Sequence, residues 1–310
     1  MSILGALVGD AAGAILEFYR KGTITREVAY NAMHMPGGGV HIVGSGQITD
    51  DGELTLTLYR ALQRNKNIRT LGYELACAYA HWYDSMPFDI GNTCSDAFCA
   101  AKEHIKGNIA SFAQLLHVIA QNNSASEANG ALMRASAIPA YIYKARGTLE
   151  QALHISRLDS QLSHPNMVCQ EINAIYVHAA YLLLHKRYDI SETYNYILHI
   201  YDTDTQRQLL DWYKMSDDVS GLDCKHNAGH IKHAFILCMY FLKNRHISYE
   251  TAILMTLMKG GDTDTNAAIV GGLVGIYSDI PKYMKNPVLS FDCTKEGNIR
   301  PSEFSVKNIA

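Results

Sequence analysis

The sequence lacks the cysteine patterns that brace small secreted proteins or build zinc knuckles. Its 310 residues include seven cysteines, an odd number, and no two of them form a Cys-x-x-Cys pair. This spacing argues against a disulfide framework and against a structural zinc site. Cys77, Cys99 and Cys238 stand in apolar helical surroundings, which predicts small core residues. Reduced thiols also predict a cytoplasmic location.

The sequence also lacks a charge excess of either sign and any long apolar run. The formal net charge is −3 and there is no Lys/Arg run, so generic nucleic-acid binding has no electrostatic support. The apolar N-terminus has no basic start and is interrupted by Asp10 and Glu17, unlike a signal peptide. The longest apolar runs, Phe235–Leu242 and Ala267–Tyr277, are too short to cross a bilayer. We expect a soluble protein with no membrane partner.

Strand signals are scarce, whereas helical periodicity is abundant. Leu54, Leu58 and Leu62 recur on one face of a helix. For Gly38–Val43 a short strand and a loop both remain open. Further helices are predicted near 71–79 and over 90–106, 109–121, 130–144, 148–163, 166–186, 189–200, 205–215, 230–243, 248–259 and 264–277. Since no linker or repeat divides the chain, we predict one all-α domain over residues 1–310.

Glycine and alanine are placed in two informative ways. Small residues recur at every fourth position in Gly5–Gly13 and in Ala267–Gly275, a spacing that lets another helix backbone approach closely. Glycine runs also precede each of two acidic segments, in Pro36–Gly39 and in Gly260–Gly261. Beside acidic clusters, such runs predict backbone that passes close to a ligand.

The two acidic segments, Thr49–Asp51 and Asp262–Thr265, each open a predicted helix. Taken singly, each fits a helix cap: Glu53 has capping-box spacing from Asp50, and carboxylates complement the helix dipole. Together they carry more carboxylates and hydroxyls than capping needs. Oxygen donors of this kind select hard cations such as Mg²⁺ or Mn²⁺, and about two divalent ions would neutralise the cluster if the segments converged. The sequence thus supports a metal-site hypothesis that depends on two distant segments meeting.

At these residues the sequence resembles the ADP-ribosylglycohydrolase family. The resembling segments follow the family's order: Gly5–Phe18, Gln47–Glu53, Asp89–Thr93, Asn129–Arg134, Ser163–Pro165 and Gly260–Ala268. The resemblance implies an orthogonal all-α fold with a binuclear Mg²⁺ or Mn²⁺ centre that removes ADP-ribose from a modified side chain. Gly52 and Ala128 depart from the family, which often has a hydroxyl residue and a glycine there, and residues 279–310 match no motif.

The resemblance also implies a role for each matching residue. The implied metal ligands are Thr49, Asp50, Asp51, Asp262, Asp264 and Thr265. The implied catalytic residues, either of which can take the proton of the attacking water, are Asp89 and Glu17. The implied substrate-binding residues are Asn92, Ser126, Asn129, Gly130 and His164. For Arg134 a structural ion pair and a phosphate contact both stay open.

The expected substrate is an ADP-ribosylated protein or ADP-ribose, with ADP-ribosyl-arginine as the leading linkage. Cleavage of a glycosidic bond needs an acid for the leaving group and a base for water, which suits these carboxylates. Three alternatives stay open: another ADP-ribosyl linkage (serine, a nucleic-acid base or a small molecule), a non-catalytic crystallin-like protein, and an immunity factor against a cognate ADP-ribosyltransferase or toxin. A zincin site is excluded because no His-x-x-x-His pair has a neighbouring Glu.

Overall fold

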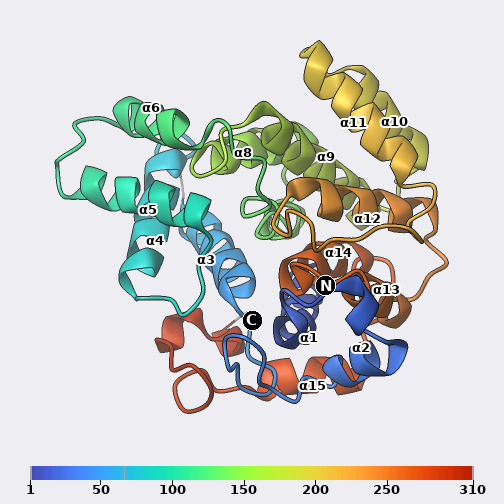
Figure 1. Ribbon diagram of the computed structural model, residues 1–310. Helices are drawn as coiled ribbons and strands as arrows, with labels where there is room; N and C mark the ends of the chain where they lie inside the picture. The colour runs from blue at the N-terminus through green and yellow to red at the C-terminus, as the bar shows by residue number, and fades with distance from the viewer. Residues whose placement is uncertain (1, 66, 309–310) are drawn as a thin grey trace.

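The computed structural model describes residues 2–65 and 67–308, and within them every regular element is a helix (Figure 1). The extended pairings in this part of the chain are isolated bridges, one of which joins Gly38 to Val43. That segment is therefore a closed loop rather than a strand. The prediction of an all-α fold is confirmed.

The first half of the chain forms the helices up to α8, and the first acidic segment lies at the start of α3. They are α1 (Ser2–Gly13), α2 (Arg26–Ala32), α3 (Asp50–Arg64), α4 (Leu71–Asp84), α5 (Asn92–Ile105), α6 (Phe112–Asn123), α7 (Ala137–Ala145) and α8 (Leu149–Gln161). The helices of the second half are α9 (Met167–Leu184), α10 (Ile190–Leu198), α11 (Thr203–Met215), α12 (Ile231–Lys243), α13 (Tyr249–Leu257), α14 (Thr263–Val274) and α15 (Lys282–Ser290). Short 3-10 turns are η1 (Ala14–Leu16), η2 (Lys21–Thr23), η3 (Ser302–Phe304) and η4 (Val306–Asn308).

Most predicted helices are present with boundaries shifted by a few residues, and the exceptions have local causes. The helix predicted from 130 begins only at Ala137, because the residues before it form successive turns beside the site. Helices α2 and α15 were not predicted, since both are short and α15 contains Pro287. The core prediction fails for Cys99, which is exposed, and for Cys77, which is half-buried, whereas Cys238 is buried.

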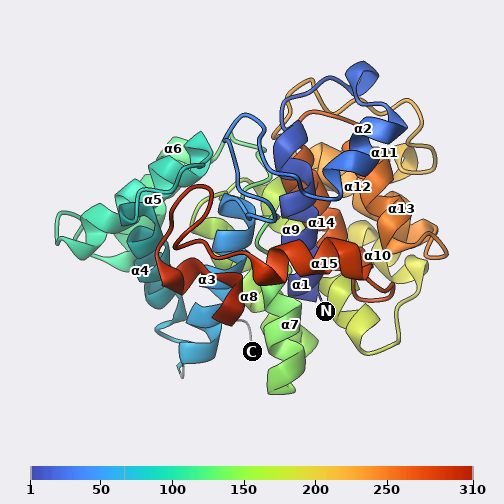
Figure 2. The same ribbon diagram turned by 90° about the horizontal axis from the view of Figure 1, so that it is seen from below.

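Helices α1 and α14 lie side by side at the centre of the molecule (Figures 1 and 2). A Cβ atom on Gly5 would lie 2.2 Å from the carbonyl oxygen of Gly271, and one on Gly9 would lie 2.0 Å from that of Ala267. The Tyr249 hydroxyl also donates a 2.7 Å hydrogen bond to the Gly5 carbonyl. The two small-residue stripes therefore pack backbone against backbone, as their spacing predicted.

The C-terminal segment, for which the sequence offered no motif, is tied to α3 by a buried ion pair. Arg300 donates hydrogen bonds from Nε to Glu53 Oε1 (2.9 Å) and from Nη2 to Glu53 Oε2 (2.9 Å). Trp82 Nε1 donates to the same carboxylate at 2.7 Å. Arg300 and Glu53 are each 3% exposed. The Glu53 carboxylate therefore binds Arg300 and does not take part in a capping box, so the capping-box interpretation is wrong.

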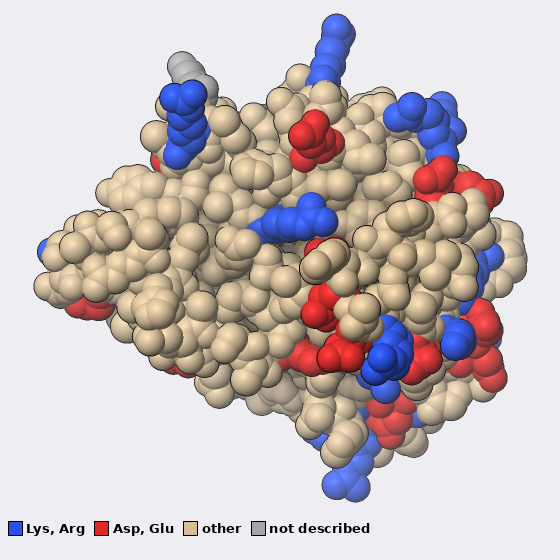
Figure 3. Space-filling view, turned by 90° about the horizontal axis from the view of Figure 1, so that it is seen from above, with Lys and Arg blue, Asp and Glu red and all other residues tan. Residues whose placement is uncertain are grey.

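The surface and the longest helix bear on possible partners. On the face in Figure 3, Lys and Arg side chains are scattered among Asp and Glu and do not merge into one basic patch. Within the described residues, α9 is long and apolar enough by composition to cross a membrane, and 78% of it is buried inside the fold. Burial of this kind is typical of a core helix.

The contact between α1 and α14 predicts a large effect for one methyl group. Replacement of Gly9 by alanine should lower the free energy of unfolding by about 1–3 kcal/mol or more, because rigid backbone occupies the space that the methyl would need. Urea unfolding followed by circular dichroism measures this. The control is Gly22→Ala, where no atom lies within 4 Å of the new Cβ; equal stability of the two variants would contradict the packing described.

The buried pair predicts a second stability effect. Arg300→Met should cost about 3–5 kcal/mol, because it leaves the Glu53 carboxylate buried with no counter-charge. Lys295→Met, which breaks an exposed pair with Asp292, should cost less than about 1 kcal/mol. Chemical denaturation of both variants under identical conditions makes the comparison. A small loss for Arg300→Met would show that the C-terminal segment is not anchored here.

Candidate active site

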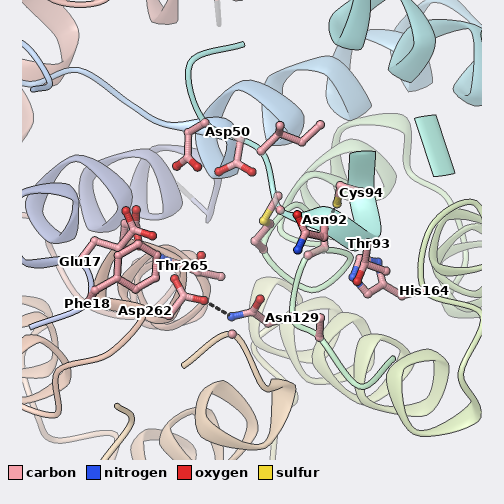
Figure 4. Close-up of a pocket in the computed structure, with 18 residues that line it drawn as sticks. Glu17, Phe18, Asp50, Asn92, Thr93, Cys94, Asn129, His164, Asp262 and Thr265 are labelled. Carbon is pink, nitrogen blue, oxygen red and sulfur yellow. Dashed lines mark hydrogen bonds between the residues drawn. The ribbon is translucent and has the colours of Figure 1, made fainter. Parts of the chain in front are cut away.

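A pocket of about 300 Å³ opens where the first turns of α3, α5 and α14 meet. Carboxylates from four separate stretches of chain line it, namely Glu17, Asp50, Asp89, Asp262 and Asp264. Figure 4 shows the labelled Glu17, Asp50 and Asp262 on one side, facing Asn92, Thr93 and His164 on the other. The structure thus brings together the two acidic segments on which the metal hypothesis depends.

The two acidic segments are joined beneath the pocket by Asp51. Its Oδ2 accepts hydrogen bonds from Thr49 Oγ1 and from Thr265 Oγ1, both at 3.2 Å. Its Oδ1 is buried and has no hydrogen-bond partner. Thr49 and Asp51 do not line the pocket surface. Asp51 lies behind the lining residue Thr265 and has one carboxylate oxygen without a protein donor.

Helix capping does not account for these acidic side chains. The residues at the N-caps of α3 and α14, Thr49 and Asp262, make no side-chain capping hydrogen bond. Asp264 Oδ1 accepts only the adjacent amide of Thr265, at 2.9 Å. The capping interpretation is therefore wrong for Asp50 and Asp262, whose carboxylates face the pocket.

Asp10 is a site residue that sequence reasoning missed. Its carboxylate accepts hydrogen bonds from the Thr49 amide (3.0 Å), the Thr49 hydroxyl (3.0 Å) and the Gly52 amide (2.9 Å), and so fixes the first turn of α3 to α1. Burial raises the pKa of Asp10 to about 7 despite these bonds. A Cβ on Gly52 would lie 2.6 Å from Asp10 Oδ2, which explains the glycine there. The available signal was a lone acid inside an apolar, small-residue helix.

Glu17 is brought to the pocket by pairing between the end of η1 and the start of α14. Phe18 N donates to the Gly261 carbonyl at 2.6 Å, and Gly261 N donates to the Tyr19 carbonyl at 2.8 Å. Phe18 lines the pocket with φ of 65°, a strained value for an aromatic residue. No local pattern in the sequence indicates this role.

One glycine from each run permits a close approach between two stretches of backbone. A Cβ on Gly261 would lie 1.9 Å from the Cys224 carbonyl oxygen, and one on Gly39 would lie 2.7 Å from Ile15 Cα. Gly39 thereby seats its loop on the turn that precedes Glu17. On that loop His41, another residue that sequence reasoning missed, places Nε2 2.9 Å from Glu17 Oε2.

Burial and mutual repulsion act on the carboxyl groups in the same direction. The pKa values of Asp50, Asp51 and Asp264 are raised well above their usual range, first by burial and then by the acidic neighbours. The same causes raise the pKa of Glu17 to about 8. Among the described residues that line the pocket, none is Lys or Arg. A bound divalent cation would supply the positive charge that the chain itself does not place there.

The opposite side of the pocket is polar and uncharged. Asn129 Nδ2 donates a 2.7 Å hydrogen bond to Asp262 Oδ2, which links this side to the acidic one (Figure 4). His164 Nδ1 lies 2.9 Å from Ser163 Oγ, and its Nε2 has no partner. Burial lowers the pKa of His164 to about 3, so the imidazole is neutral. A Cβ on Gly130 would lie 2.9 Å from the His164 ring.

On the substrate side, Ser126 and Arg134 also lie outside the pocket surface. Ser126 does not line it, and its hydroxyl lies 3.0 Å from the hydroxyl of Thr93, which does. Ser126 therefore supports the substrate side from behind. Arg134 is fully buried and binds Asp159 at 3.0 Å, so its role is the structural ion pair and not a phosphate contact.

Comparison with known proteins agrees with this arrangement. The family model for ADP-ribosylglycohydrolases matches residues 1–299. A protein of Acanthamoeba polyphaga mimivirus, whose name places it among the ADP-ribosyl glycohydrolases, is 29% identical, and the alignment covers 95% of this chain and 91% of that protein. The ADP-ribosyl-[dinitrogen reductase] glycohydrolase of Rhodospirillum rubrum is 25% identical over 90% of this chain and 86% of that enzyme.

A solved structure shares the fold. A chain of an ADP-ribosylglycohydrolase-related protein complex superposes with a TM-score of 0.66 and 19% identity, covering 93% of this chain and 94% of that chain. The helical fold, the convergence of the acidic segments and a family match over nearly the whole length lead to one conclusion: this chain belongs to the ADP-ribosylglycohydrolase family and is an ADP-ribosyl glycohydrolase.

Proposed function

We propose that this enzyme removes ADP-ribose from a modified protein side chain, with ADP-ribosyl-arginine as the leading substrate, by metal-dependent cleavage of the glycosidic bond at the distal ribose. The observation that carries the proposal is the convergence of buried carboxylates on one pocket with no Lys or Arg in its described lining. Support for a protein substrate comes from the Rhodospirillum rubrum relative, whose name specifies ADP-ribosyl-dinitrogen reductase.

The donor set fits a pair of divalent cations, Mg²⁺ or Mn²⁺. The residues that would hold them are Thr49, Asp50, Asp51, Asp262, Asp264 and Thr265, all of which offer oxygen. Asp51 Oδ1 and Glu17 Oε2 are buried and have no hydrogen-bond partner, which leaves both available as ligands. Cations in such a site polarise ribose oxygens and make bound water more acidic.

The uncharged side of the pocket suits the diphosphate and ribose of the substrate. Helix α5 begins at Asn92, and its N-cap residue Gly91 provides no side-chain cap, so the first amide groups of α5 are open to an anion. Asn92, Asn129 and Gly130 line the pocket next to these amides. A neutral His164 donates or accepts a hydrogen bond without adding charge.

The chemical step needs a base for water, and the pocket offers Asp89 and Glu17. Both line it, and both have raised pKa values because they are buried. A carboxylate whose pKa approaches neutrality is a better proton acceptor than an ordinary one. The departing protein side chain needs a proton, and the carboxyl groups of this pocket would supply it.

The cysteines indicate the cellular compartment in which the reaction takes place. All seven cysteines are free, which fits a cytoplasmic enzyme. A cognate ADP-ribosyltransferase or toxin would then supply the modified protein. Serine-linked, base-linked and small-molecule ADP-ribose conjugates are the competing substrates that the release assay below distinguishes.

Activity depends on the acidic cluster in this proposal. Asp50→Ala and Asp262→Ala should each reduce metal-dependent release of ADP-ribose from ADP-ribosyl-arginine protein by at least about 100-fold, because each removes a carboxylate that faces the pocket. Chromatography of released ADP-ribose, with Mg²⁺, Mn²⁺ or EDTA, measures this. Asp204→Ala on the exposed face of α11 is the matched control. Unchanged turnover in both pocket variants would refute the model, and faster release from serine-linked substrate would reassign the leaving group.

Metal should raise stability as well as activity, whereas loss of a pocket carboxylate should raise the stability of the metal-free protein and lower its activity. A cation at 100 times its dissociation constant should stabilise the folded protein by about 2.7 kcal/mol, and EDTA should reverse the gain. Asp262→Asn should stabilise the metal-free protein, because it relieves repulsion among buried carboxylates, and should abolish the metal-induced increase in Tm. Differential scanning calorimetry tests both effects. A metal response retained in Asp262→Asn would mean that the ion binds elsewhere.

A further inference from the structure

His41 stands in a rigid loop beside the acidic pocket, outside the residues assigned above to metal or substrate. Backbone hydrogen bonds close the loop from Gly38 N to Val43 O (2.8 Å) and from Val43 N to Gly38 O (2.9 Å). Asn298 Nδ2 donates to the His41 carbonyl at 2.9 Å from the C-terminal segment. These contacts fix the backbone of His41 beside the pocket.

The contact between His41 and Glu17 is not an ordinary hydrogen bond. His41 Nε2 and Glu17 Oε2 lie 2.9 Å apart, yet both are buried atoms without a hydrogen-bond partner. Because this approach lacks hydrogen-bond geometry, both atoms stay available to a third group such as a cation. Glu17 is only 8% exposed, so solvent does not account for its free oxygen.

Asp89 completes a set of three donors. Its Oδ2 lies 3.5 Å from His41 Nε2, and one ligand atom from each of Glu17, His41 and Asp89 falls within 4.8 Å of the others. Glu17 also belongs to a second set of the same kind with Asp262 and Asp264. One carboxylate thus connects a nitrogen-containing set to an all-oxygen set.

We propose that Glu17, His41 and Asp89 form a mixed oxygen–nitrogen site for a divalent transition-metal ion, adjoining the all-oxygen site and sharing Glu17 with it. This inference rests on the proposed metal-dependent function. Imidazole is accepted by first-row transition ions, whereas Mg²⁺ takes oxygen ligands and keeps its waters. The site would therefore make the enzyme favour Mn²⁺ over Mg²⁺. Asp89 keeps a second oxygen, which remains free to accept the proton of water.

Electron spin echo spectroscopy of the Mn²⁺-loaded protein tests the proposal without an activity readout. The wild-type protein should show ¹⁴N modulation from a directly bound imidazole. His41→Ala should abolish it and weaken Mn²⁺ binding, measured by calorimetry, at least about tenfold while changing Mg²⁺ binding by less than about threefold. His117→Ala, which removes an exposed histidine on α6, should leave both quantities unchanged.

A second variant separates ligation from folding. His41→Gln retains a polar side chain and should also lose the ¹⁴N modulation, with circular dichroism showing that both variants are folded. Mn²⁺ binding by the wild-type protein without ¹⁴N modulation, or modulation that persists in His41→Ala, would overturn the role of His41 and leave the proposed function standing. Failure of the wild-type protein to bind Mn²⁺ at all would overturn both.

Discussion

The site depends on the backbone contact between α1 and α14. Glycines on α1 let the carbonyls of Ala267 and Gly271 approach to distances that any side chain would block. This contact sets the start of α14, with Asp262 and Asp264, beside the end of α1. Asp10 on α1 then accepts hydrogen bonds from the amides of Thr49 and Gly52, which holds the first turn of α3 against α1. One helix therefore aligns both acidic segments.

That alignment creates an electrostatic conflict which packing alone does not resolve. The carboxylates are buried, their pKa values are raised, and the described pocket lining holds no Lys or Arg. Elsewhere the protein neutralises buried charge internally, as in the pairs Arg300–Glu53 and Arg134–Asp159. The acidic groups that remain here without such partners could hold a metal ion. Destabilisation of the folded protein by such a cluster is typical of a functional site.

Much of the fold and site was predictable because the relevant signals are periodic or local. Helical periodicity located most helices, and the stripe of glycines in α1 predicted its close packing. Paired carboxylates at two helix starts suggested a metal site, and the family resemblance supplied the residues of the other wall. Asp10 and His41 were missed for a different reason: each is a lone polar residue in its segment, and only the tertiary arrangement of distant loops gives it a partner.

The sequence also misled at Glu53. Its spacing suggested a helix cap, yet its carboxylate forms a buried ion pair with Arg300, which lies far away in the chain. Local motifs specify what a residue is able to do, whereas burial and the neighbours it meets decide which of those roles it performs.

The most direct test of the central claim is a crystal structure of the Mn²⁺-loaded enzyme with anomalous scattering recorded for manganese. We expect anomalous peaks within ligand distance, about 2.0–2.4 Å, of the Asp50, Asp262 and Asp264 carboxylates. Full-occupancy peaks elsewhere and none at these carboxylates would contradict it.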